Sequence, residues 1–161
     1  MSKKIAKTNV MRILDSIKVK YNQYSYPVID GHVDGISVAN HIGKDCSVVF
    51  KTLVVQGHSK SFYVFVIPVA ENLDLKKASR SCGEKKIEMI HVKDINKVTG
   101  YIRGGCSPIG MKKQYKTFID ESARNIDKII VSAGKIGYQV ELSVEDLIMA
   151  TGASLSDIVV R

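Results

Sequence analysis

The sequence predicts an α+β fold, and three observations lead to this prediction. Apolar residues recur at helical spacing in some segments and form strand-length, β-branched runs in others. Neighbouring runs are joined by short turns, which favour hairpins over the strict strand–helix alternation of a parallel α/β sheet. A chain of 161 residues can bury one hydrophobic core, so we expect a single domain over residues 1–161 with a mixed or antiparallel sheet.

Residues 8–18 place apolar side chains at the i, i+3, i+4 and i+7 positions of an amphipathic helix. Asp74 and Gly83 bracket a later helix as its N-cap and its stop. The elements expected before residue 100 are, in order, a helix at 8–18, a strand at 24–28, a helix at 37–42, strands at 48–56 and 62–69, a helix at 75–82, a strand at 87–90 and a helix at 92–98.

The C-terminal third repeats this mixture. Strands are expected at 115–119, 128–132 and 138–142, and a helix follows at 144–151. Ser143 with Asp146 forms a capping pair for that helix, and Gly152 ends it. Segment 133–137 resembles a phosphate loop only superficially, because the Walker spacing and the following helix are missing, so we expect a hairpin turn there.

The net charge of +8, from 24 basic and 16 acidic residues, is concentrated in clusters. These clusters are Lys76–Lys77, Lys85–Lys86, and Arg103 with Lys112, Lys113 and Lys116. Clustered cations attract polyanions, although a solvated lysine-rich face explains them equally well. The chain has no tryptophan, so any nucleic-acid contact should be made to the backbone rather than by base stacking.

Composition also excludes several classes of protein. No stretch approaches the roughly 18 to 20 apolar residues of a membrane helix, and no signal-peptide core follows the basic N-terminus. We therefore expect a cytoplasmic protein without membrane contact. Cys46, Cys82 and Cys106 show no paired or metal-type spacing, and the four histidines add none, so neither a metal site nor a cofactor is expected.

Two local patterns indicate a small-ligand pocket, and the first is a polar interruption of a strand. Lys51 and Thr52 lie at the centre of an apolar run, where burying an unpaired ammonium is costly. Lys51 is either a binding or catalytic lysine, or an edge lysine whose stem packs while its ammonium reaches water. Thr52 points to the opposite face of the strand, because side chains alternate.

The second pattern is Gly104–Gly110, whose three glycines allow the backbone to approach a ligand closely. The glycine-flanked position of Cys106 in this loop suggests a cysteine nucleophile. Such a nucleophile needs a base, and the sequence shows no histidine or acid for that role, so we favour a loop cysteine without a catalytic function. Ser107 precedes Pro108 and is better explained as a turn residue than as an oxyanion donor.

Taken together, these segments resemble the YbaK/EbsC family of aminoacyl-tRNA deacylases, above all the YbaK branch that hydrolyses Cys-tRNA(Pro). The segments that carry the resemblance are Phe50–Val54, Val66–Val69, Leu73–Lys77, Thr99–Ile102, Gly104–Lys113 and Ser132–Gly137. The resemblance implies a mixed sheet curled into a barrel-like shape and flanked by helices. It also implies aminoacyl-tRNA, specifically tRNA(Pro), as the substrate, and prolyl-tRNA synthetase as a candidate partner.

The family's mechanism follows from the same resemblance. Prolyl-tRNA synthetase cannot fully reject cysteine, which is similar in size to proline. The thiol of the mischarged cysteine then closes onto its own ester, an intramolecular attack with a high effective molarity. By carry-over, Lys51 contacts the terminal adenosine, and the Gly105 backbone donates to the carbonyl oxygen. The residues expected to line the pocket are Tyr26, Thr52, Ser132 and Gln139. Gln139 replaces an aspartate of YbaK relatives, so no carboxylate role is expected there.

Other interpretations remain open at this point. The preserved glycine loop does not exclude a deacylase for Ala-tRNA(Pro), the task of another branch of the superfamily. A module that grips aminoacyl-tRNA or a synthetase without turnover is a second alternative, and a nucleotide-binding scaffold for an unrelated ligand is a third.

Overall fold

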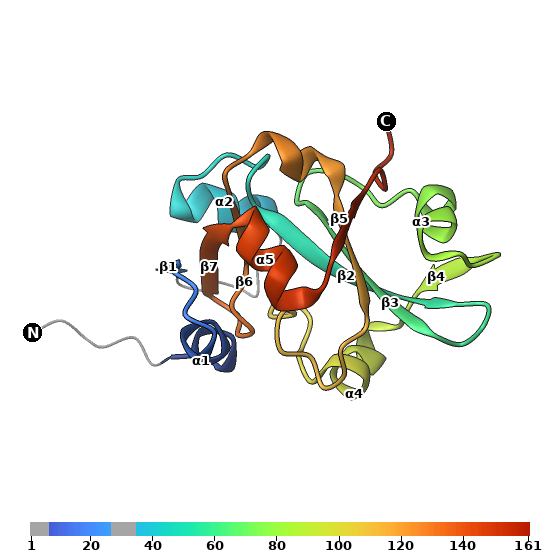
Figure 1. Ribbon diagram of the computed structural model, residues 1–161, viewed down its shortest axis with the longest axis horizontal. Helices are drawn as coiled ribbons and strands as arrows, with labels where there is room; N and C mark the ends of the chain where they lie inside the picture. The colour runs from blue at the N-terminus through green and yellow to red at the C-terminus, as the bar shows by residue number, and fades with distance from the viewer. Residues whose placement is uncertain (1–6, 27–34) are drawn as a thin grey trace, which may run out of the picture.

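The computed structural model describes residues 7–26 and 35–161, which form an α+β fold with two β-sheets (Figure 1). The small sheet is antiparallel, in the order β1 (Asn22–Ser25), β7 (Tyr138–Ser143) and β6 (Lys128–Ser132). The large sheet has the order β4 (Ile87–Met89), β2 (Phe50–Gly57), β3 (Phe62–Pro68), β5 (Lys116–Asp120) and β8 (Ser154–Ser156). The large sheet is mixed, because β3, β5 and β8 run parallel while β2 runs antiparallel to both of its neighbours.

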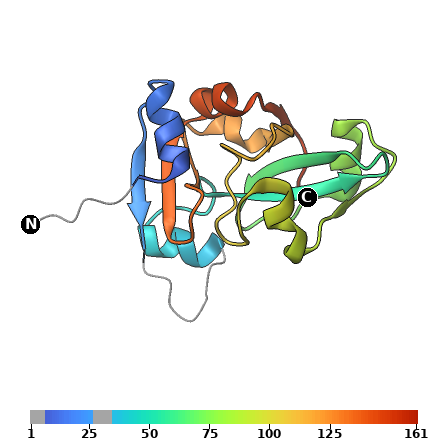
Figure 2. The same ribbon diagram turned by 90° about the horizontal axis from the view of Figure 1, so that it is seen from below.

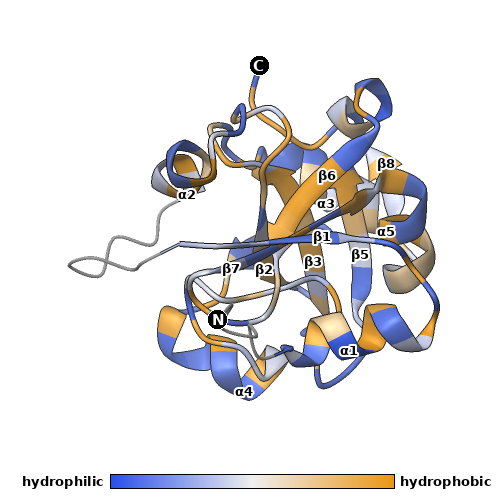
Figure 3. Ribbon diagram, turned by 90° about the vertical axis from the view of Figure 1, so that its left-hand side faces the viewer, coloured by the Kyte–Doolittle hydropathy of each residue, from blue (hydrophilic) through white to orange (hydrophobic). Residues whose placement is uncertain are grey.

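The helices lie around these sheets. Two of them stop just before the predicted glycines, Gly83 and Gly152, whereas the helix predicted at 8–18 ends at Ser16 and the one predicted at 92–98 begins only at Ile95. They are α1 (Asn9–Ser16), α2 (Gly35–Ile42), α3 (Leu75–Cys82), α4 (Ile95–Thr99) and α5 (Val144–Thr151), with 3₁₀ turns at Val92–Asp94 and Glu121–Asn125. The Asp74 carboxylate accepts hydrogen bonds from two N–H groups in the first turn of α3, and Gly83 ends that helix with a φ of 74°. Figure 3 shows that α1 and α4 carry both polar and apolar residues, whereas β6 is apolar along its middle, between Lys128 and Ser132.

The two sheets join at a bridge between Val49 and Ile130, where the Ile130 N–H donates to the Val48 carbonyl at 2.9 Å. Helix α5 lies in front of the sheets in Figure 1 and along one side of them in Figure 2. Its Leu147 is fully buried in the core cluster that also contains Phe50 and Val140. Residues 51 and 52 follow the junction directly on β2, so the polar interruption of this strand lies where the sheets meet.

The predicted α+β class, with a mixed sheet and flanking helices, is confirmed. The strands form two joined sheets that do not close into a barrel. Segment 133–137 is the expected hairpin turn, in which the Ala133 N–H donates to the Tyr138 carbonyl at 3.0 Å. Strand β8 and the 3₁₀ turn at 121–125 were not predicted, because both are short and lack a clear periodicity. Residues 27–28 of the first predicted strand lie outside the described residues.

In the described segments, no helix is long and apolar enough to cross a membrane. Across the same residues, no group of three or more His, Cys, Asp or Glu side chains is arranged to hold a metal ion.

Candidate functional site

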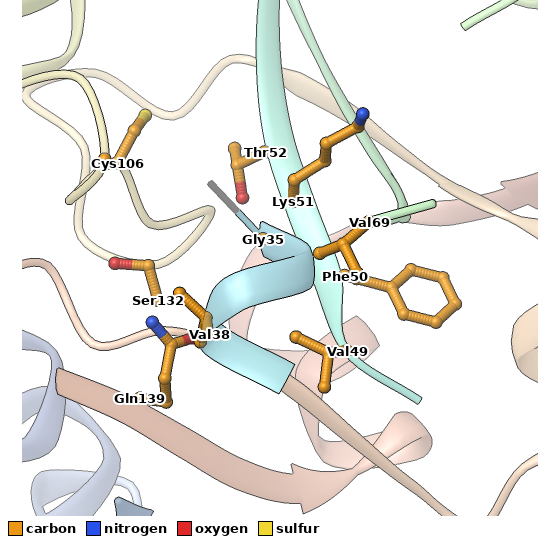
Figure 4. A pocket seen from close by; sticks show the side chains of 11 residues that line it. Gly35, Val38, Val49, Phe50, Lys51, Thr52, Val69, Cys106, Ser132 and Gln139 are labelled. Atoms are coloured by element: carbon orange, nitrogen blue, oxygen red, sulfur yellow. The ribbon is translucent and has the colours of Figure 1, made fainter. Parts of the chain in front are cut away.

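A cavity of about 100 Å³ lies beside the junction of the two sheets (Figure 4). Its walls come from β2, from the β6–β7 hairpin, from the start of α2 and from the glycine loop after α4. The lining residues are Gly35, Val38, Val49, Phe50, Lys51, Thr52, Val69, Gly104, Cys106, Ser132 and Gln139. Four of the predicted site residues, Lys51, Thr52, Ser132 and Gln139, are therefore brought together from segments that are distant in the sequence.

The β6–β7 hairpin provides one polar wall of this pocket. Ser132 pairs directly with Gln139 in the antiparallel register, so their side chains lie on the same face of the sheet. Figure 4 shows the Gln139 amide beside Ser132. Gln139 is 5% exposed, and its amide is neutral. This wall can exchange hydrogen bonds with a ligand without placing a charge there.

Lys51 and Thr52 provide the opposite wall and point in different directions. The Thr52 Oγ1 is buried and has no hydrogen-bond partner among the described residues. Figure 4 shows this hydroxyl directed into the pocket and the Lys51 ammonium directed away from Ser132 and Gln139. Burial lowers the pKa of Lys51, while the Glu71 carboxylate acts in the opposite sense. Thr52 thus presents an unused hydrogen-bonding group, and Lys51 carries a partly desolvated cation at the edge.

Backbone from the glycine loop closes the pocket. Gly104 and Cys106 line the cavity, whereas Gly105 is buried behind them. The Gly105 N–H donates to the Ile102 carbonyl at 3.0 Å, so in this structure it closes a turn. A Cβ on Gly105 would lie 3.0 Å from the Ile136 nitrogen, tighter than ordinary contacts. The absence of a side chain at Gly105 therefore allows the two glycine-bearing loops to pack together.

Cys106 is not equipped as a nucleophile. Burial raises the pKa of its thiol to about 11, so the thiol is neutral near pH 7. Among the described residues that line the pocket, none is a histidine or a carboxylic acid that could serve as its base. The adjacent Ser107 is fully buried, and its Oγ accepts the Ile109 N–H at 3.2 Å, as expected of a turn residue.

Tyr26 is not among the described residues that line the pocket. Its ring stacks on that of His41 with centroids 5.9 Å apart, and its N–H donates to the Gly137 carbonyl at 3.0 Å. Tyr26 ends the first described segment. Its predicted contact with substrate remains a prediction.

The sequence did not reveal the apolar side of the pocket. Val38, Val49 and Val69 are each at most 6% exposed, and they meet the polar groups across the cavity. A Cβ on Gly35 would collide with the side chain of Val69. Nothing in the local sequence distinguishes these valines from ordinary core residues, because their role depends on long-range packing.

The fold and the pocket define a compact α+β domain that can hold a small polar group without offering a nucleophile of its own. The family model for the aminoacyl-tRNA editing domain matches residues 33–150. The chain belongs to this family, and it is an enzyme that removes the aminoacyl group from tRNA.

Individual relatives agree with this assignment. A protein of Enterococcus faecalis with the provisional name Cys-tRNA(Pro)/Cys-tRNA(Cys) deacylase EbsC is 45% identical over 155 residues, covering 96% of this chain and 94% of that protein. A crystal structure provisionally described as a trans-editing enzyme for prolyl tRNA synthetase matches with a TM-score of 0.82 at 20% identity, covering 97% and 100% of the two chains. A hypothetical protein matches with a TM-score of 0.85, also at 20% identity, covering 94% and 99%. At this identity, both structures show the fold alone.

Proposed function

We propose that the protein hydrolyses Cys-tRNA(Pro), and more weakly Cys-tRNA(Cys), by a reaction in which the substrate supplies the nucleophile. One observation carries this proposal. The pocket offers hydrogen-bonding groups from Thr52, Ser132 and Gln139, but no described lining residue is a histidine, a carboxylic acid or an activated nucleophile. A thiol on the aminoacyl group supplies what the pocket lacks. The name of the Enterococcus relative supports the same substrates.

The proposed reaction needs only the groups of the substrate and one water molecule. The cysteine sulfur attacks its own ester carbonyl, a C–S bond forms, and the C–O bond to the terminal ribose breaks. The thiol proton ends on the ribose oxygen, the amino acid leaves as a thiolactone, and water opens that ring. Holding the cysteine in the reactive conformer accelerates such an intramolecular step strongly. The three valines would exclude larger side chains, and the hydroxyl and amide groups would orient the aminoacyl group.

Lys51 and the glycine loop would stabilise the charge that develops on the ester oxygen. Lys51 stands at the edge of the pocket, where its ammonium can reach the ribose or a phosphate. A donor role for the Gly105 N–H requires its bond to the Ile102 carbonyl to open or to be shared. The neighbouring Gly104 and Cys106 already face the cavity, which favours this segment as the oxyanion side of the site.

The test is deacylation of tRNA(Pro) charged in turn with cysteine, alanine, proline and serine. We expect fast release from Cys-tRNA(Pro), with a thiolactone detected by mass spectrometry, and slow release of serine, whose hydroxyl ionises far less readily than a thiol. Preferential release of alanine would instead identify an Ala-tRNA(Pro) deacylase. Binding without release would identify a non-catalytic module.

Selectivity for tRNA(Pro) needs a further source, because the pocket is sized for the aminoacyl end alone. We include prolyl-tRNA synthetase as the partner that supplies it. The assay is therefore run on Cys-tRNA(Pro) and Cys-tRNA(Cys), with and without the synthetase. The synthetase should raise the preference for tRNA(Pro), and an unchanged preference would remove it as a partner.

A further inference from the structure

Tyr101 contacts both glycine-bearing loops of the site, but it is not among the described residues that line the cavity. It follows the end of α4 and precedes the glycine loop at Gly104–Gly110. Its side chain is only 9% exposed. A buried tyrosine combines an apolar ring with a hydroxyl that needs a hydrogen-bond partner. The contacts of the ring and of the hydroxyl therefore show what this residue holds in place.

The hydroxyl of Tyr101 closes the glycine loop. It donates a hydrogen bond to the carbonyl of Ile109, a residue that is itself buried. Because Tyr101 precedes the loop and Ile109 lies near its end, this bond ties the two ends of the loop together. Burial raises the pKa of Tyr101 to about 12, so the hydroxyl keeps its proton and stays a donor at neutral pH.

The ring of Tyr101 packs against the turn of the β6–β7 hairpin. A Cβ on Gly134 would lie 2.9 Å from the ring atom Cε1 and 3.0 Å from Cγ2 of Val10 in α1, so both side chains touch the turn backbone. The Gly134 N–H in turn donates to Oγ of Ser132 at 3.2 Å. This bond uses an acceptor site of the hydroxyl and leaves its proton available for a ligand. The packing on Gly134 therefore bears on how Ser132 faces the pocket.

The two loops also meet directly, where Gly105 approaches the backbone of Ile136. A single contact fixes a distance but lets the loops rotate about it, whereas a second contact through Tyr101 also fixes their orientation. Helix α1 limits movement on the other side, because a Cβ on Gly110 would lie 2.7 Å from Cδ1 of Ile13 and 3.0 Å from the Tyr101 hydroxyl. Tyr101 is thus enclosed by the parts that it joins.

We propose that Tyr101 is a positioning residue for deacylation, whose side chain holds the glycine loop and the hairpin wall with Ser132 in their working arrangement. This inference rests on the proposed function, in which the glycine loop stabilises the ester oxygen and Ser132 orients the aminoacyl group. Both tasks depend on geometry, because an intramolecular attack and an oxyanion contact lose rate when the groups are slightly displaced. Tyr101 itself touches neither substrate nor reacting atoms in this account.

The first experiment measures kcat, KM and the pH profile of kcat on Cys-tRNA(Pro) for Tyr101→Phe, which removes the hydroxyl and keeps the ring. We expect kcat to fall by about tenfold while KM stays within about twofold, because the displaced groups act in the transition state. The pH profile should keep its parental shape, since Tyr101 transfers no proton. Tyr115→Phe is the matched control: that hydroxyl also donates to a backbone carbonyl, of Val98 at 2.7 Å, and Tyr115 does not line the pocket.

Three results of this experiment would overturn the proposal. They are a parental kcat in Tyr101→Phe, an equal loss in Tyr115→Phe, and a loss that falls on KM or changes the shape of the pH profile. Tyr101→Leu tests the ring. It should lower kcat by about a further tenfold, because the packing on Gly134 is lost as well. Equal kcat values for folded Tyr101→Leu and Tyr101→Phe would overturn the role of the ring, and thermal unfolding checks that each variant is folded.

The second experiment follows the glycine loop without deacylation, by alkylation of Cys106 with iodoacetamide. Cys106 is a half-buried free thiol in the loop, and Cys46, a half-buried free thiol between α2 and β2, is the internal reference. Mass spectrometry gives the ratio of the two labelling rates. Tyr101→Phe should raise this ratio by about tenfold, because a released loop exposes its thiol, and Tyr115→Phe should leave it unchanged.

The labelling ratio separates this inference from the proposed function. An unchanged ratio in Tyr101→Phe would show that the hydroxyl does not hold the loop, which overturns the proposal even when the parent hydrolyses Cys-tRNA(Pro). A raised ratio in a protein whose parent releases no cysteine would instead refute the proposed function, and the hold of Tyr101 on the glycine loop would stand.

Discussion

The pocket shares Lys51, Thr52, Val69 and Gly104 with a second cavity of about 530 Å³, called the groove, yet different structural elements form the two. The pocket is walled by strands of both sheets, and its valines are at most 6% exposed. The outer part of the groove comes from short elements, β4 and the 3₁₀ turn at 92–94, and its side chains are about half exposed. A rigid, buried wall discriminates by size, because neighbouring side chains cannot move aside. An exposed apolar surface provides affinity with little discrimination. On the proposed function, the rigid wall of the pocket selects the aminoacyl group by size.

Lys51→Ala should produce the largest effect, because Lys51 stands between the two cavities. Removing a charge-assisted hydrogen bond costs about 2 to 3 kcal/mol of transition-state stabilisation, which is about a hundredfold in rate. The deacylation rate on Cys-tRNA(Pro) measures this, and thermal unfolding checks the fold. Lys128→Ala, an exposed strand lysine outside the pocket, is the control. If Lys51→Ala deacylates Cys-tRNA(Pro) at the parental rate, Lys51 has no role in the reaction: its stem packs against the protein and its ammonium is solvated.

Gly35→Ala should give the next largest effect, because it displaces residues in the buried wall of the pocket. The new methyl group would collide with Val69, so we expect a loss of about tenfold in kcat/KM for Cys-tRNA(Pro). The double variant Gly35→Ala with Val69→Gly removes both colliding atoms of residue 69 and leaves its Cα 3.6 Å from the added methyl group, so it should recover most of that activity. Val69→Ala alone should widen the pocket and raise the relative rate on Pro-tRNA(Pro). No recovery in a folded double variant would show that the packing of residue 35 on residue 69 does not set the pocket's size.

Replacing Lys112 and Lys113 with Ala tests whether the basic surface beyond the groove contacts tRNA. Both lysines are exposed, and the Lys112 N–H donates to the Thr99 carbonyl at the end of α4, next to the groove. The slope of log affinity for tRNA against log salt should become flatter by about one unit or less for each phosphate that the protein no longer neutralises. An unchanged slope would mean that this pair faces solvent without touching tRNA.

Cys106→Ser should produce the smallest effect, within about threefold of the parental rate, because the thiol is neutral and no base accompanies it. The pH profile sharpens the test. A thiol attacks as its thiolate, so the rate rises with pH up to the pKa of the attacking thiol. The rise should level off near the free-thiol pKa of about 8.5, as for the substrate's cysteine. A rise that continues to the Cys106 pKa of about 11, or an acyl-enzyme caught at Cys106, would identify a cysteine hydrolase.

Local signals predicted most of the elements correctly because each depends on near neighbours. Asp74 caps α3 with its own side chain, and Ser143 caps α5 in the same way. The β6–β7 hairpin follows from the two glycines in its turn, Gly134 and Gly137, whose φ angles are 88° and 90°. The paired positions of Ser132 and Gln139 follow from that hairpin alone. The hairpin predicts their pairing, whereas their place in the site was implied by the family resemblance.

The sequence by itself determined the α+β class, the strand that carries Lys51 and Thr52, and the glycine loops, because backbone propensity and a misplaced charge are local properties. Only the tertiary structure decided that these pieces meet beside the Val49–Ile130 bridge. It also decided that Gly105 packs on Ile136, that Gly35 faces Val69, and that Met89 and Val92 line a groove. The physical reason is that the same apolar residue types occur in cores, pockets and surface grooves, so the sequence does not distinguish these environments. Whether such a residue fills a core, lines a buried pocket or lines an open groove depends on contacts between distant segments.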